Sequence, residues 1–197
     1  MAVVMRNIVE QAPRRRAPDN EPMTSLRPLF AALLGLSAAA CSPTLDWREF
    51  MAEGSGVVAS FPCRPDRHAR RVQLAAASRQ MEMLVCEAGG ATFALAFVDM
   101  VDPASVGVTL AELRGIALRN VQGGAPTLAP MQVSGMTPNE ASVRMAAAGR
   151  LPDGAPVRTH AAFFTRGLRV YQATVIGTEP SLATVQTFFD ALKFPAL

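Results

Sequence analysis

Residues 81–98 read MEMLVCEAGGATFALAFV, and this stretch decides the fold. In its second half Phe93, Leu95 and Phe97 alternate with small residues, which is the period-2 pattern of a strand with one bulky face. The first half is an apolar run of strand length, and the glycine pair at 89–90 is a turn signal. Two strands joined by so short a turn pair antiparallel. The stretch therefore predicts a β-hairpin.

Further strand patterns lie on both sides of this hairpin, and a turn signature at residues 151–154 (LPDG) joins two of them. Strands that follow one another in runs favour an α+β fold, with an antiparallel sheet of about six or seven strands covered by helices, over alternating βαβ units. The expected strands outside the hairpin span residues 57–61, 72–75, 131–133, 140–148, 157–165 and 168–176.

Two helices are expected to cover the sheet. Thr109 followed by Glu112 has the capping-box spacing, so the first helix is expected to begin there and to end at the glycines 123–124. The second is expected to begin within residues 178–181, with Pro180 near its first position.

Five of the ten methionines are candidates for a binding surface or for the core. They could line an adaptable binding surface, but we expect Met81, Met83 and Met145 to fill the core. The other two are Met131 and Met136.

The N-terminal region has the layout of a secretory signal peptide. Residues 23–41 read MTSLRPLFAALLGLSAAAC, with Arg27, then an apolar run, then small residues before Cys41. The twelve residues 29–40 are too few to span a bilayer, which takes about 20. With cysteine at the cleavage point, the stretch resembles the lipobox of bacterial lipoproteins, which implies acyl chains on Cys41. Ala38 stands where the lipobox usually has leucine, so cleavage by the ordinary signal peptidase is the alternative.

The predicted domain organisation follows from this signal. Residues 1–40 form an extension and signal peptide, with translation starting at Met23 or, alternatively, at Met1. Residues 41–56 form the lipid anchor and a spacer, whose Trp47 and Phe50 we expect to dock on the single α+β domain at 57–197. Ser42 resembles the residue that follows the cysteine in Gram-negative lipoproteins sorted to the outer membrane. The periplasmic face of that membrane is therefore the expected location. The alternative is a soluble periplasmic or secreted protein.

The charge of the chain argues against nucleic-acid binding. Residues 1–40 hold five of the 19 basic residues and three of the 16 acidic ones, so the rest of the chain has a net charge of only +1. A nucleic-acid binder would show a clustered basic face. The densest basic run, residues 64–71, is interpreted as a solvated turn; the alternative is a patch for anions or a membrane surface.

Two further stretches resemble a known family. GVVASFPCRP at residues 56–65 and TVQTFFDALKF at 184–194 resemble the opening strand and closing helix of PsbP/Mog1-like domains. The resemblance implies an αβα sandwich with an antiparallel sheet. These domains are mostly adaptors and accessory factors, so it implies no reaction and no catalytic residue.

The cysteines other than Cys41 form an even pair. Cys63 and Cys86 fall near strand ends in a chain expected in an oxidising compartment, so we expect a disulfide between them. The alternative is two buried free thiols. A zinc site of Cys63, His68, Cys86 and His160 is disfavoured, since its spacings are irregular and a disulfide would occupy both thiols.

No residue pattern points to catalysis. His68 is expected in the arginine-rich turn and His160 within a strand between Thr159 and Ala161, where a histidine is more often a sheet-surface or partly buried residue than a catalytic base. Asp99 and Asp102 flank a strand end and are interpreted as solvated loop carboxylates rather than a general-acid pair. We therefore expect no catalytic, cofactor or metal site.

The leading hypothesis is a non-enzymatic lipoprotein that acts as an accessory or interaction module, bound to the membrane through acyl chains and to an envelope protein. The alternatives are a small-ligand carrier with a pocket between sheet and helix and, least supported, an envelope hydrolase. An interaction module should expose an apolar patch, and a carrier should have a concave apolar pocket.

Overall fold

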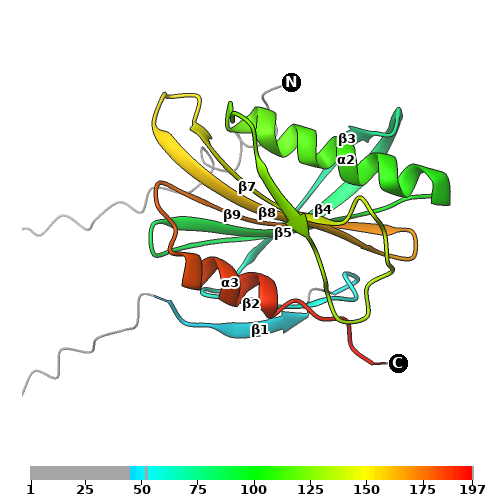
Figure 1. Cartoon of the computed structure of the whole chain (residues 1–197). Helices are drawn as coiled ribbons and strands as arrows, with labels where there is room; N and C mark the ends of the chain where they lie inside the picture. The colour runs from blue at the N-terminus through cyan, green and yellow to red at the C-terminus, as the bar shows by residue number, and fades with distance from the viewer. Residues whose placement is uncertain (1–44, 52, 197) are drawn as a thin grey trace, which may run out of the picture.

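The computed structural model describes residues 45–51 and 53–196. In this part of the chain a seven-stranded antiparallel sheet, ordered β3-β4-β5-β9-β8-β7-β6, lies beside a two-stranded sheet and two helices (Figure 1). The elements are β1 Arg48–Met51, β2 Val58–Phe61, β3 Asp66–Leu74, β4 Ala77–Ala88, β5 Ala91–Asp99, α2 Pro103–Asn120, β6 Thr127–Pro130, β7 Val143–Arg150, β8 Pro156–Arg166, β9 Arg169–Gly177 and α3 Leu182–Asp190.

The predicted hairpin is present as β4 and β5. Its turn uses Gly89 and Gly90, which have φ of 58° and 74°, a left-handed conformation that costs glycine little. Strand β5 pairs with β4 on one side and with β9 on the other. It therefore joins the strands before α2 (β3 to β5) to the strands after it (β6 to β9). Phe93 and Leu95 on β5 are fully buried.

Each face of the large sheet is covered. Helix α2 packs on one face, and α3 lies on the other together with β1 and β2 (Figure 1). The α+β class with an antiparallel sheet is therefore confirmed, although β1 and β2 form a small sheet of their own. The α2 face buries Met81, Met83 and Met145, as expected from the sequence.

The described part of the expected spacer packs on the domain. Trp47 meets the ring of Phe93 edge-on with 5.8 Å between centroids, and Phe50 meets Phe61 in the same way at 6.2 Å. Phe188 of α3 contacts Phe61 at 5.3 Å and Phe93 at 5.4 Å. These rings connect α3, the small sheet and the large sheet.

The predicted N-cap of the first helix, Thr109, is wrong by seven residues. Asp102 is its N-cap, accepting a hydrogen bond from Ala104 N at 3.0 Å, and Pro103 follows at the first helical position. Asp102 caps the free amides of a helix start that lies about two turns before the predicted one at Thr109. Thr109 is fully buried inside the helix. For the second helix, Ser181 is the N-cap, so Pro180 lies before the helix rather than at its first position.

The end of α2 also differs from the prediction. The residue with left-handed backbone is Gln122, at φ 48°, rather than a glycine of the 123–124 pair. The Gly123 amide donates to Leu118 O at 3.0 Å and the Gln122 amide to Arg119 O at 3.1 Å, which are the two bonds of a Schellman motif.

The basic run at residues 64–71 is not a turn, because from Asp66 onward it belongs to β3. Strand β3 is the edge of the large sheet, where one side faces solvent and charged residues are well tolerated. Arg67 Nε donates to Glu82 Oε2 at 3.0 Å on the neighbouring strand. The strand expected at 131–133 is also displaced, since β6 ends at Pro130.

The turn between β3 and β4 has strained backbone. Ala75 and Ala76 have φ of 48° and 58°, where a side chain costs about 1–2 kcal/mol. Ala76 is exposed, so Ala76→Gly is expected to raise the free energy of unfolding by about 0.5–1 kcal/mol, measured by urea unfolding. The same change at exposed Ala111, inside α2, should lower it by about 1 kcal/mol. Equal effects at both positions would contradict the assignment of strain.

Candidate functional site

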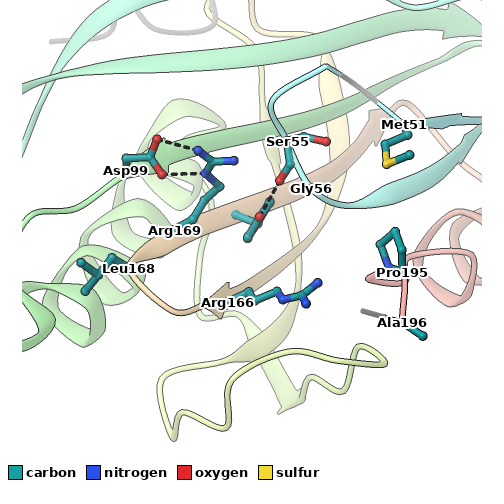
Figure 2. Close-up of a pocket in the computed structure, with 10 residues that line it drawn as sticks. Met51, Ser55, Gly56, Asp99, Arg166, Leu168, Arg169, Pro195 and Ala196 are labelled. Carbon is teal, nitrogen blue, oxygen red and sulfur yellow. Dashed lines mark hydrogen bonds and ion pairs between the residues drawn. The ribbon is translucent and has the colours of Figure 1, made fainter.

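A surface cleft of about 490 Å³ lies at the end of the large sheet where β8 turns into β9 (Figure 2). Gly167, at φ 58°, allows the tight turn, which places Arg166 and Arg169 opposite each other in the strand register. We call this the hairpin cleft. Its lining comes from the β1–β2 connection, β5, the β8–β9 hairpin and the chain after α3: Met51, Ser55, Gly56, Asp99, Arg166, Leu168, Arg169, Tyr171, Pro195 and Ala196.

Most charged and hydroxyl side chains of the hairpin cleft are hydrogen-bonded to other groups of the protein. Arg169 donates to both carboxylate oxygens of Asp99, at 2.6 and 2.7 Å, and to Gly54 O. The hydrogen bond to Asp99 raises the pKa of Arg169. The Tyr171 hydroxyl donates to Ser55 O at 2.6 Å, and burial raises its pKa. These bonds fix the β1–β2 connection against β9.

Arg166 differs from the other charged groups of the hairpin cleft. Its guanidinium lies 4.9 Å from the ring centroid of Phe194, and no carboxylate pairs with it among the described residues. No dashed line reaches it in Figure 2. Because Asp99 balances Arg169, the lining has a net charge of +1. A guanidinium fixed on an aromatic face keeps its planar set of donors available for a carboxylate or phosphate.

Exposed apolar side chains surround the hairpin cleft. Met51 and Leu168 line it and are 61% and 40% exposed. Val101, 72% exposed, follows Met100, whose amide donates to Leu168 O at 2.9 Å. The cleft therefore combines an available cation with an apolar rim.

A second cleft of about 570 Å³ lies beside edge strand β6. Leu128, Pro130 and Met136 give it apolar walls, and Glu140 adds one acidic group. Neither of these two clefts is the pocket between sheet and helix that a carrier was expected to have.

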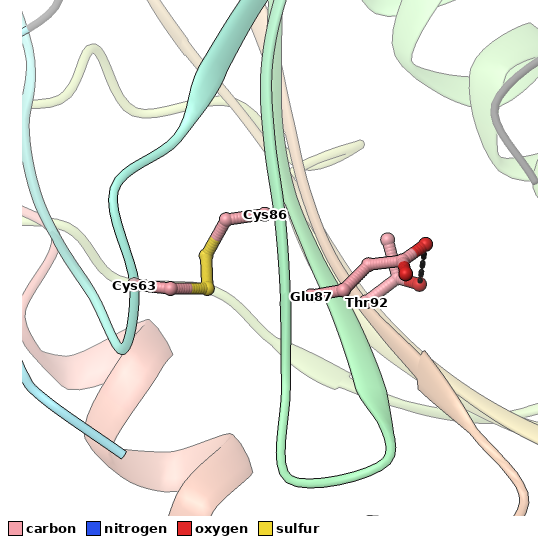
Figure 3. Close-up of a disulfide and its surroundings, with 4 residues drawn as sticks. All are labelled: Cys63, Cys86, Glu87 and Thr92. Atoms are coloured by element: carbon pink, nitrogen blue, oxygen red, sulfur yellow. Dashed lines mark hydrogen bonds between the residues drawn. A yellow bond between two sulfur atoms is a disulfide. The ribbon is translucent and has the colours of Figure 1, made fainter. Parts of the chain in front are cut away.

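The predicted disulfide is present. Cys63, just after β2, is bonded to Cys86 of β4, with 6.0 Å between their Cα atoms (Figure 3). The bond ties the small sheet to the large one. Cys41 lies outside the described residues, so the structure does not bear on its lipidation.

The two histidines lie on different strands of the part of the chain that the structure describes. His68 is exposed on β3 opposite Met83, and His160 lies on β8 opposite Val175. Burial, and next the positive charge of Arg158, lower the pKa of His160. Within residues 45–51 and 53–196, no group of three or more His, Cys, Asp or Glu could hold a metal ion.

The two carboxylates interpreted as solvated loop groups are both exposed, although Asp99 is the last residue of β5 and not part of a loop. Each also has a structural partner, since Asp99 binds Arg169 and Asp102 caps α2.

In the part of the chain that the structure describes, no helix is long and apolar enough to cross a membrane. The functional assignment thus depends on the hairpin cleft, the disulfide and the signal-like N-terminus. Compared with known proteins, the chain matches no family model and no curated sequence.

Proposed function

We propose that this protein is an exported lipoprotein, anchored by acyl chains on Cys41 to the periplasmic face of the outer membrane. Its domain, of the PsbP/Mog1-like type, acts without catalysis as an interaction module. The layered antiparallel architecture supports the fold assignment. The Cys63–Cys86 bond supports export, because disulfides persist mainly in oxidising compartments.

The observation that carries the interaction role is the hairpin cleft. Arg166 has no carboxylate partner among the described residues, and exposed Met51 and Leu168 lie beside it. Such a surface fits a protein segment with a carboxylate next to an apolar side chain. Acid–base catalysis would need a titratable group free to exchange a proton, whereas Asp99 and Tyr171 are both engaged.

Charge reversal at Arg166 tests the interaction role. With Arg166→Glu, partner binding is expected to weaken about tenfold or more, since a hydrogen-bonded charge pair contributes about 1.5–3 kcal/mol and is replaced by repulsion. The measurement is affinity capture of tagged full chain from membranes, with each recovered protein quantified by mass spectrometry. The matched control is Arg158→Glu on the same strand, which is exposed and outside the cleft. A partner recovered equally with both variants would contradict the role of the hairpin cleft.

Substitution of Cys41 tests the anchor. Cys41→Ser is expected to move the protein from the membrane fraction to the soluble periplasmic fraction. Two or three acyl chains hold a protein firmly in a membrane, and without the Cys41 thiol none can be attached. Fractionation with immunoblotting measures this. The double variant Cys63→Ser/Cys86→Ser should stay with the membrane. If the unaltered protein is soluble, or Cys41→Ser remains bound, the lipid anchor is refuted.

A small-ligand carrier is the second candidate. The cleft volume of about 490 Å³ is within the range of small-molecule sites, and its cation favours an anionic ligand. Native mass spectrometry of the purified protein would support this candidate if a small molecule is retained by the unaltered chain and lost with Arg166→Glu.

A further inference from the structure

The large sheet has two ends: the chain enters the domain at one, and the hairpin cleft lies at the other. At one end β1 begins, close to the β4–β5 turn and the start of α3 (Figure 1). Trp47 contacts Phe93, two residues into β5, while Asp99 at the far end of β5 lines the hairpin cleft. The six steps from Phe93 to Asp99 rise about 20 Å. We call the first end the anchor end.

The link from Cys41 to the anchor end is short. Four peptide units separate Cys41 from Leu45, which gives a reach of at most about 14 Å. From Asp46 onward the chain is fixed to the domain, since the Asp46 amide donates to Pro62 O at 2.8 Å. An acylated Cys41 would therefore keep the anchor end close to the lipid headgroups.

One exposed apolar side chain favours direct contact there. Leu182 is the first residue of α3 and is 68% exposed. Four residues separate it from the end of β9 at Gly177, which pairs with Ala91 beside the β4–β5 turn. An exposed leucine fits the headgroup boundary, where apolar side chains are partly removed from water. The hairpin cleft exposes apolar side chains too, so the short link from Cys41, and not this leucine, selects the anchor end as the one at the membrane.

We propose that the domain contacts the bilayer surface with its anchor end and holds the hairpin cleft away from it, on the aqueous side of the headgroups. This orientation rests on the lipid anchor proposed above. A headgroup layer is about 5–8 Å thick. The four steps from Trp47 to Met51, which lines the cleft, rise about 13 Å, and Asp99 lies about 20 Å from Phe93, so the hairpin cleft is beyond that layer. The partner then reaches the cleft from the aqueous compartment rather than from within the membrane plane.

The chain contains one tryptophan, Trp47, which is a natural probe at the anchor end. The full lipidated chain is reconstituted into phosphatidylcholine vesicles in which some headgroups bear a nitroxide quencher. Trp47 fluorescence is expected to be quenched. In Trp47→Phe/Leu168→Trp, which moves the probe to the rim of the hairpin cleft, quenching should be several-fold weaker. The matched control, Trp47→Phe/Leu182→Trp, returns the probe to the anchor end and should be quenched like Trp47.

Flotation of the same vesicles separates the two proposals. If the protein does not float with the lipid, the anchor is refuted and the orientation falls with it. If it floats but tryptophan at 168 is quenched as strongly as at 47 or 182, the domain lies on its side, and the orientation alone is overturned. Floating protein without quenching at 47 and 182 overturns it as well.

Discussion

Phe188→Ala is expected to lower the free energy of unfolding by about 3–5 kcal/mol. Phe188 is fully buried in α3, and its ring lies between Phe61 and Phe93 at 5.3 and 5.4 Å. Removing it leaves a cavity where α3, the small sheet and the large sheet meet, and the neighbouring rings are fixed by their own strands. Urea unfolding followed by circular dichroism measures the loss.

Two variants test the cause of this effect. Phe188→Leu keeps most of the volume and should cost about half as much or less. Leu182→Ala, in the same helix at an exposed position, should stay within about 0.5 kcal/mol of the unaltered protein. If Phe188→Ala costs no more than Leu182→Ala, the aromatic cluster does not hold α3 in place.

The double variant Cys63→Ala/Cys86→Ala is expected to lose about 3 kcal/mol of stability. The bond joins residues 23 apart. Closing a loop of this length reduces the entropy of the unfolded chain, which raises its free energy by about that amount at 25 °C. For a domain of this size the melting temperature should fall by about 6–12 °C, at 2–4 °C per kcal/mol. Differential scanning calorimetry of the oxidised protein and the variant measures the change.

Reducing agent provides the control for this prediction. It should lower the melting temperature of the unaltered protein to near that of the variant and leave the variant unchanged. If iodoacetamide labels both cysteines of the denatured but unreduced protein, the bond is absent.

Patterns with a local cause could be predicted from the sequence. The alternation at residues 93–97 and the turns at 89–90 and 151–154 gave correct strands, because pleat and turn geometry depend on neighbouring residues. The start of α2 was missed because two capping signals compete within one stretch. The one chosen, Thr109, is buried by tertiary packing that no local pattern reports.

Features that depend on the order of strands could not be predicted in the same way. The arginine-rich segment forms β3 because it lies at a sheet edge, and edge position follows from the whole topology. The hairpin cleft is assembled from distant segments: Tyr171 binds Ser55, 116 residues away. The only local hint of the cleft is the pair of arginines at residues 166 and 169, which face each other across the turn. In the sequence, such a pair looks the same as in any exposed hairpin.

The position of the disulfide has a mechanical consequence. A pull between the two ends of the chain passes along the backbone to Cys63, across the sulfur atoms, and on from Cys86. Residues 64–85, which include β3 and most of β4, lie off that path and carry no load while the bond is intact. Tension applied at the N-terminal side can peel β1 from β2, but it cannot extend the segment between the cysteines. In a pulling experiment, reduction should lengthen the released contour by the 22 residues between them.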